Sequence, residues 1–175
     1  MRERTLFERR FSCRSFETRP ISRDTLEAIL EAARWAPSGG NLQPWRFVVV
    51  LDSGRRRALA GAAFGQTFLA GAPVVITVCA VPDESASKYG TRGRELYCLQ
   101  DTAAAAQNIL LAATGLGLGS CWVGAFDEAA VARELDLPTA WRALALIAIG
   151  WPAEVEPRRS RRSPAEVVRW IESCQ

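Results

Sequence analysis

The sequence of 175 residues contains no histidine. Histidine is the commonest general base in enzymes and the commonest metal ligand. Its absence excludes catalysis by a Ser-His-Asp or Cys-His arrangement, and we expect no metal site. Any chemistry that this chain performs must therefore come from other side chains or from a bound organic group.

Paired cysteines and long apolar runs are also missing. The five cysteines include no C-x-x-C pair, and their odd number argues against a disulfide framework and for a reducing compartment. The start, MRERTLFERR, has no apolar segment of a secretory signal. No uninterrupted apolar stretch reaches the roughly 18 residues of a membrane span. We expect a cytoplasmic protein with its cysteines in the core.

The composition is that of an ordinary globular protein. About half of the residues are apolar and about a quarter are charged, and the length suits one domain, residues 1–175. The net charge of +3 is mild, but arginines gather near both ends. The basic stretch 157–163 has no interleaved aromatic residue, which a single-stranded nucleic acid site would favour. We therefore expect no nucleic-acid partner and treat this stretch as a basic linker.

Hydrophobic periodicity predicts helices and buried strands in one layered domain. In the segment 24–35, apolar residues recur on one helical face, with Asp24 and Glu27 as a capping pair and Pro37 as the stop. Short β-branched runs predict strands, and residues 82–95 look polar and loop-like. The predicted strands are 46–51, 73–81 and 143–150, and the other predicted helices are 55–70, 95–114, 127–136 and 164–173.

The predicted helix 95–114 is apolar on nearly every side and carries four consecutive alanines, residues 103–106. A helix of this kind is normally buried all round. One domain of 175 residues offers few elements to cover it, so we expect a second copy of the chain to pack against it.

Two stretches could hold a polar ligand. In RRFSCRSF, the residues Arg10, Ser12 and Arg14 alternate, so in an extended segment they share a face that would suit a phosphate. In WAPSGGNLQPW, small residues let the backbone approach a ligand, and Ser38 and Asn41 add polar groups. Taken singly, a solvated basic segment and a helix-to-strand turn explain them equally well.

Two further stretches are weaker signals. GLGLGSCWVGAF, residues 115–126, is glycine-rich but matches no phosphate-loop pattern, and a mobile turn after the long helix explains it. EPRRSRRSP, residues 156–164, carries four arginines within five positions and fits a solvated linker or half of a phosphate clamp.

Together, in this order and spacing, these stretches resemble the nitroreductase family of FMN-dependent oxidoreductases. The resemblance covers nearly the whole chain. Its motifs are R-x-S-x-R-x-F from Arg10, AAR-x-APSGGN-x-QPW-x-FVVV at 32–50, QD-x-AAAAQN at 100–108, GLGSCWVGAFD at 117–127, and GWP with Arg162 before the last helix.

The resemblance implies a set of FMN contacts. Arg10, Ser12 and Arg162 would hold the phosphate, and Arg14 would stabilise the anionic reduced flavin near N1 and O2. The other contacts that it implies are backbone groups of Gly124 and Ala125 near N5, Gln66 from the partner subunit, and the turn of Pro37, Ser38, Gly39 and Asn41 along the ring.

The resemblance also implies the fold and the activity. The expected fold is α+β, a mixed sheet surrounded by helices, in an intertwined homodimer with FMN at the interface. FMN would pass hydride from NAD(P)H to a small acceptor such as a nitroaromatic or quinone, without a catalytic side chain. The alternatives are dehydrogenation or reductive dehalogenation on the same fold, or FMN binding without catalysis. The short segment 82–95 implies a more open pocket than in larger relatives.

Overall fold

A four-stranded sheet lies at the centre of the computed structural model, which describes residues 4–155 and 160–172. The strands are β1 (Trp45–Val50), β2 (Val74–Ala80), β3 (Gly119–Val123) and β4 (Arg142–Gly150), in the order β1-β2-β4-β3. Every neighbouring pair is antiparallel. The parallel component of the expected mixed sheet is confined, among the described residues, to a bridge between Ser12 and Ser120.

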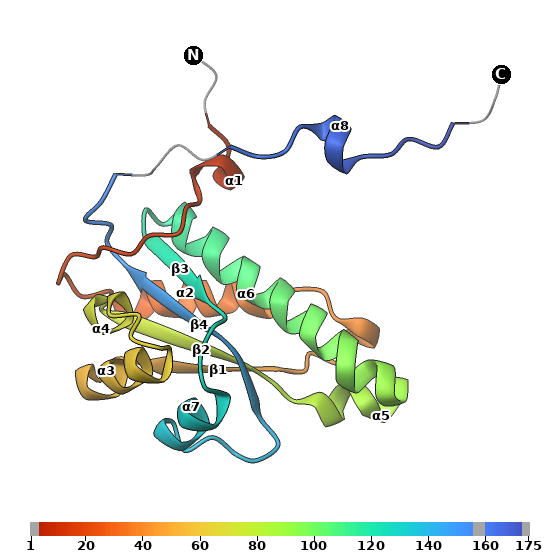
Figure 1. Ribbon diagram of the computed structural model, residues 1–175, viewed down its shortest axis with the longest axis horizontal. Helices are drawn as coiled ribbons and strands as arrows, with labels where there is room; N and C mark the ends of the chain where they lie inside the picture. Colours follow the sequence, from red (N-terminus) through yellow and green to blue (C-terminus); the bar gives the residue numbers. More distant parts are fainter. Residues whose placement is uncertain (1–3, 156–159, 173–175) are drawn as a thin grey trace.

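Helices cover both faces of this sheet (Figure 1). Along β2, Val74, Ile76 and Val78 pack on one side with α2 and α6, whereas Val75 and Cys79 pack on the other side with α3, α4 and α7. Successive side chains of a strand point to opposite faces of the sheet, so β2 is buried on both faces. The helices are α1 (Leu6–Arg9), α2 (Arg23–Arg34), α3 (Ser53–Ala62), α4 (Phe68–Gly71), α5 (Pro82–Arg92), α6 (Cys98–Gly115), α7 (Glu128–Glu134) and α8 (Pro164–Val167).

The three strands predicted from β-branched runs are present, each within one residue of its expected bounds. The sequence interpretation missed β3, because its glycine-rich surroundings indicated a turn. β3 is short and lies at an edge of the sheet, paired on one side with β4. An edge strand is paired on one side only, and a short strand of this kind carries a weak sequence signal.

Several helix predictions require correction. The cap of α2 is Ser22, whose Oγ accepts from the Thr25 backbone N–H at 3.2 Å, and not the pair Asp24 and Glu27. The predicted helix 55–70 is interrupted at Phe64 and Gly65, both with positive φ, and is split into α3 and α4. The predicted cap of α7, Asp127, is confirmed by its bond from the Ala130 N–H at 3.0 Å.

Residues 82–95 are helical and not a loop. Pro82 begins α5, and Asp83 and Glu84 lie in its first turn, where a proline and negative charge favour a helix start. The chain kinks at Gly90 (φ 55°) and continues through a π-helical turn, η2 (Gly93–Tyr97), into α6. A side chain at Gly93 would lie 2.3 Å from the Ser85 carbonyl oxygen, so this close approach requires glycine.

The last helix of the chain is shorter than the sequence predicts. Among the described residues of the predicted terminal helix 164–173, only α8 is helical, and Val168 is already extended. All described residues from 160 to 172 are exposed, and Figure 1 shows α8 projecting away from the body of the chain. The first part of the predicted basic linker, through residue 159, lies outside the described residues. Within the described parts of the chain, no helix is long and apolar enough to cross a membrane.

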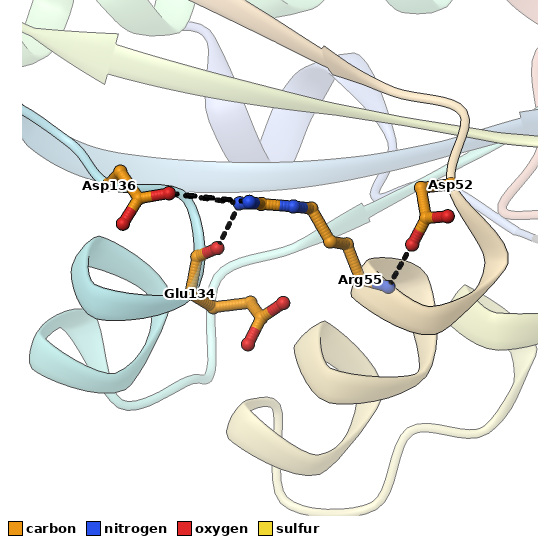
Figure 2. Close-up of polar contacts among 4 residues, drawn as sticks. All are labelled: Asp52, Arg55, Glu134 and Asp136. Atoms are coloured by element: carbon orange, nitrogen blue, oxygen red, sulfur yellow. Dashed lines mark hydrogen bonds and ion pairs between the residues drawn. The ribbon is translucent and has the colours of Figure 1, made fainter.

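One group of polar contacts ties together α3 and α7, which cover the same face of the sheet. Figure 2 shows the Arg55 side chain of α3 reaching the Glu134 carbonyl and the Asp136 carboxylate at the end of α7, with its Nη2 3.3 Å from Asp136. The Arg55 backbone N–H donates to the capping carboxylate of Asp52 at 2.8 Å. This contact holds α3 and α7 side by side over the same face of the sheet.

Candidate functional site

The N-terminal segment after α1 is extended, which is the state in which its alternating residues share a face. Ser12 bridges Ser120, the Cys13 backbone N–H donates to the Ser120 carbonyl at 3.0 Å, and Phe16 bridges Pro152. Cys13 is buried, whereas its neighbours Ser12 and Arg14 are partly or fully exposed. The segment therefore adds to the edge of β3 and turns its polar side chains outward.

The arginines of this segment carry uncompensated charge. Neither Arg10 nor Arg14 forms an ion pair among the described residues, and the Arg14 guanidinium lies over the Phe68 ring at 5.7 Å from the centroid. Glu154 is nearby, but it accepts the backbone N–H groups of Arg14 and Ser15. The Arg14 backbone hydrogen bond is the main cause that lowers the pKa of Glu154. The Arg14 guanidinium makes one long hydrogen bond, to the Ser12 carbonyl at 3.5 Å, so both guanidiniums still have N–H groups that can bind an anion.

Gln66 and the loop after β3 meet within one chain. The Gln66 side-chain amide donates to the Ala125 carbonyl and the Ala63 carbonyl, both at 3.2 Å. Gly124 and Ala125 are exposed. Arg14 lies over Phe68, the first residue of α4, two residues after Gln66. The sequence-predicted residues Arg14, Gln66 and Ala125 therefore come from three segments on the same side of the sheet.

The turn between α2 and β1 has an unusual backbone. Gly40, Asn41 and Gln43 have φ of 60°, 56° and 52°, in the left-handed region that few L-residues adopt. Local hydrogen bonds hold it: Ser38 Oγ accepts the Gln43 backbone N–H at 3.0 Å, and the Gln43 amide donates to Asn41 Oδ1 at 3.3 Å. The Ser38 hydroxyl proton and the Asn41 amide remain available to a ligand, and Pro37 is exposed beside them.

A carboxylate that the sequence interpretation assigned no role anchors this turn. Asp101, in the first turn of α6, accepts the Gly39 backbone N–H at 3.1 and 3.2 Å with its two oxygens. It is 8% exposed, and this burial raises its pKa above the usual range. The motif QD-x-AAAAQN contains Asp101, but only the folded chain brings it to a turn 62 residues away.

The two groups of predicted residues lie at opposite ends of the sheet. The turn precedes Trp45 of β1, which is level with Ala80 and Arg142, whereas Ser12 is level with Ser120 and Ile149. The strand β4 between these levels is roughly 26 Å long at about 3.3 Å per residue. β1 and β3 are also opposite edges. One chain therefore does not bring Ser38 and Asn41 together with Arg10, Ser12 and Arg14.

Arg162 stands apart from both groups. It is exposed on the segment before α8, and no hydrogen bond or ion pair joins its side chain to another described residue. An apolar cavity of ≈ 240 Å³ lies between α6 and the strands β2, β3 and β4, lined by Leu99, Ala103, Trp122 and Leu144 among others. Ala103 and Trp122 are exposed there, so this face of α6 is left partly uncovered by the chain itself.

Comparison with known proteins identifies this architecture. The model of the Nitroreductase family matches residues 7–68 and 56–151. The chain belongs to the nitroreductase family. The matched ranges include both the N-terminal segment and the turn, and they end at Trp151, one residue after β4. Both groups of predicted residues thus lie within the matched ranges, and Arg162 lies outside them.

Three similar proteins align with this chain over most of their own length. A protein of Archaeoglobus fulgidus, named NADH dehydrogenase/NAD(P)H nitroreductase, is 38% identical over 83% of this chain and 82% of its own. An NADH dehydrogenase of Thermus thermophilus is 34% identical over 93% and 92%. A solved nitroreductase family protein of Clostridium novyi NT has a TM-score of 0.78 and 31% identity over 85% and 84%.

Proposed function

We propose that this protein is a single-domain, FMN-dependent oxidoreductase that passes hydride from NAD(P)H to a small electrophilic acceptor, such as a nitroaromatic or a quinone. The observation that carries the proposal is that Arg14, on the extended segment with Arg10 and Ser12, lies over Phe68, two residues after the Gln66 that binds the Ala125 carbonyl, in a member of the nitroreductase family. Bound FMN would accept two electrons as hydride and return them to the acceptor.

The donor set fits a flavin mononucleotide. Arg10 and Ser12 offer a guanidinium and a hydroxyl on one extended segment, which suits a terminal phosphate. Arg14, unpaired by any carboxylate among the described residues, would face the ring edge that gains negative charge on reduction. The backbone of Gly124 and Ala125 would meet the reacting edge of the ring. FAD should bind less well, because its extra AMP would have to pass between the arginines.

The remaining contacts require a second copy of the chain. Ser38, Gly39 and Asn41 would meet the rim of the flavin, yet they lie at the far end of the sheet from Arg10 in their own chain. We therefore propose a homodimer in which each flavin receives the N-terminal segment of one subunit and the turn of its partner. Arg162 would reach the phosphate across the same interface. Gln66 already contacts Ala125 in its own chain, so we assign it to the subunit that supplies Arg14.

The proposed reaction needs no catalytic side chain. With a nitro acceptor, one NAD(P)H and one proton convert the nitro group to a nitroso group, with release of NAD(P)⁺ and water. The two substrates would use the same face in turn, which gives ping-pong kinetics. The protein would bind and orient both partners and supply the positive charge of Arg14 where negative charge develops.

A visible spectrum tests the central claim. The protein prepared with excess FMN should elute from a sizing column yellow, with one FMN per subunit, and anaerobic NADH or NADPH should bleach it. A nitroaromatic acceptor should then restore the colour. A protein that emerges without flavin absorbance after this treatment would contradict the proposal.

Arg14→Ala tests the electrostatic role. It should weaken FMN binding and slow reduction by NAD(P)H, since hydrogen bonds to a charged group contribute about 1.5–3 kcal/mol. Arg57→Ala, which removes an exposed charge from α3, serves as the control. An Arg14 variant that binds and reduces FMN at the unaltered rate would show that Arg14 has no such role.

A further inference from the structure

A cluster of cations and aromatic rings covers the glycine turn. The cluster comprises Lys88, Tyr89, Arg92 and Tyr97, from α5 and η2. A Cβ atom built on Gly40 would lie 2.7 Å from Lys88 Nζ and 2.8 Å from the Tyr89 hydroxyl oxygen. The polar ends of these two side chains therefore sit directly over the turn, beside the Ser38 and Asn41 groups that we assign to the flavin rim.

The two cations of the cluster lack carboxylate partners. Neither Lys88 nor Arg92 forms an ion pair among the described residues, although other arginines of the same region do, Arg94 with Asp83 and Arg46 with Glu84. The nearest buried carboxylate, Asp101, is occupied by the Gly39 backbone N–H. The charges of Lys88 and Arg92 are therefore uncompensated at an exposed position beside the turn.

The two tyrosines hold these cations and add flat surface. Lys88 Nζ lies 5.5 Å from the Tyr89 ring centroid, and the Arg92 guanidinium lies 5.3 Å from that of Tyr97. Arg92 Nε also donates to the Tyr97 hydroxyl at 3.0 Å. The two rings meet edge to face, with centroids 5.1 Å apart. Cation–π contact places each positive charge over a ring face, and partly exposed rings offer a surface on which a planar molecule can stack.

We propose that this cluster selects substrates that carry an anionic group on an aromatic or heteroaromatic frame. The inference rests on the proposed function, because it places the cluster next to the flavin. Two substrates of the reaction could bring the anion: an acceptor with a ring carboxylate, or the 2′-phosphate of NADPH. The shared chemistry is an oxyanion held by Lys88 and Arg92 while the attached planar group lies against Tyr89 and Tyr97.

The first measurement uses ligands that cannot be reduced. Calorimetric titration should show tighter binding of benzoate than of the neutral isostere benzamide, and Lys88→Gln should reduce this preference by about tenfold, the loss expected for one charge-assisted hydrogen bond. Lys88→Arg should retain the preference. Arg57→Gln, which removes equal charge from distant α3, should leave it unchanged.

Two kinetic arms separate the sources of the anion. With a fixed donor, kcat/KM for para-nitrobenzoate is compared with that for para-nitrobenzamide; with the neutral acceptor, NADPH is compared with NADH. The arm that loses selectivity in Lys88→Gln and Arg92→Gln identifies the anionic substrate. That selectivity should also fall in about 1 M salt, where the screening length is about 3 Å.

The outcomes distinguish this inference from the proposed function. A protein that binds FMN and reduces the neutral acceptor, but shows equal benzoate and benzamide affinities and unchanged selectivity in both variants, overturns the role of the cluster alone. Loss of FMN binding in the unaltered protein overturns the proposed function instead. The titration of benzoate against benzamide still decides the cluster in that case, because it requires no reduction, and equal affinities there overturn it.

Discussion

Gly39 and Gly40 are neighbours in the same turn but have different steric surroundings. Gly40 has φ of 60°, where an L-residue costs roughly 1–2 kcal/mol, and its Cβ would collide with Lys88 and Tyr89. A Cβ on Gly39 would make ordinary contacts at 3.5 Å or more. The two positions therefore form a matched pair, in which only one requires glycine.

We predict that Gly40→Ala lowers the free energy of unfolding by about 1–2 kcal/mol and also weakens FMN binding, because the turn must shift. Gly39→Ala should change stability by no more than about 0.5 kcal/mol. Urea unfolding and FMN titration of both variants test this. Equal losses of unfolding free energy in the two variants would show that the positive φ of Gly40 is not the determining feature.

Asp101 anchors the turn at Gly39 at a cost in stability. Burial raises its pKa above that of the unfolded chain. The folded state therefore favours the protonated form, so its contribution to stability is fully present below the unfolded pKa near 3.8 and is lost as pH rises through the folded pKa. At neutral pH, the buried charge opposes folding, while its oxygens still hold Gly39.

We predict that Asp101→Asn stabilises the protein at neutral pH and that the gain disappears as the pH falls below the unfolded pKa of the carboxyl. The amide keeps an oxygen acceptor for the Gly39 N–H, whereas Asp101→Leu leaves that N–H without a partner and should be destabilised. Urea unfolding across this pH range measures the difference. A constant difference at all pH values would contradict the assigned cause.

At the scale of the element, α6 presents a narrower free face than its composition suggests. The chain itself covers Ala105, Ala106, Ile109 and Ala113 almost completely with α2 and the sheet. The stripe that remains contains Ala103 and Gln107, with the apolar cavity beside Ala103. The chain itself therefore covers most of the apolar surface of this helix, and the face available to a partner is this stripe.

Two alanine substitutions on α6 should therefore have opposite consequences. Ala105→Glu buries a charge in the core of one chain and should unfold it, since an unpaired buried charge costs several kcal/mol. Ala103→Glu should leave the circular dichroism spectrum unchanged but should dissociate the dimer and release FMN. Sedimentation of Ala103→Glu as a flavin-bound dimer would remove α6 from the proposed interface.

At the scale of the whole molecule, the chain leaves its C-terminal arm, residues 160–172, without cover. The exposed fractions of Trp170 and Ile171 are 80% and 88%. Large exposed apolar side chains in a row are typical of a surface that binds a partner. Since the proposed flavin site also requires two copies, we assign this arm to the second subunit, where Arg162 would follow it to the phosphate.

We predict that the double variant Trp170→Ala and Ile171→Ala destabilises the dimer while the isolated fold and Arg162 remain. Arg162→Ala should do the reverse, with weaker FMN binding in an intact dimer. Sedimentation at micromolar concentration and FMN titration separate the two effects. If the double variant forms as stable a dimer as the unaltered chain, the arm has no part in assembly.

The sequence by itself determined the local features of this protein. The β-branched runs predicted β1, β2 and β4, since a fully buried strand is a continuous apolar segment. The motifs indicated the family that the comparison shows. These features depend on residues close together in the chain, so their signal survives without the fold.

Only the tertiary structure decided what depends on distant contacts. The helical segment 82–95 meets β1 through the ion pair of Glu84 with Arg46, and β3 pairs with β4. Asp101 meets Gly39 across 62 residues. The separation of Ser38 from Ser12 follows from the strand order of the sheet. Such relations arise from long-range packing and pairing, which no local pattern encodes.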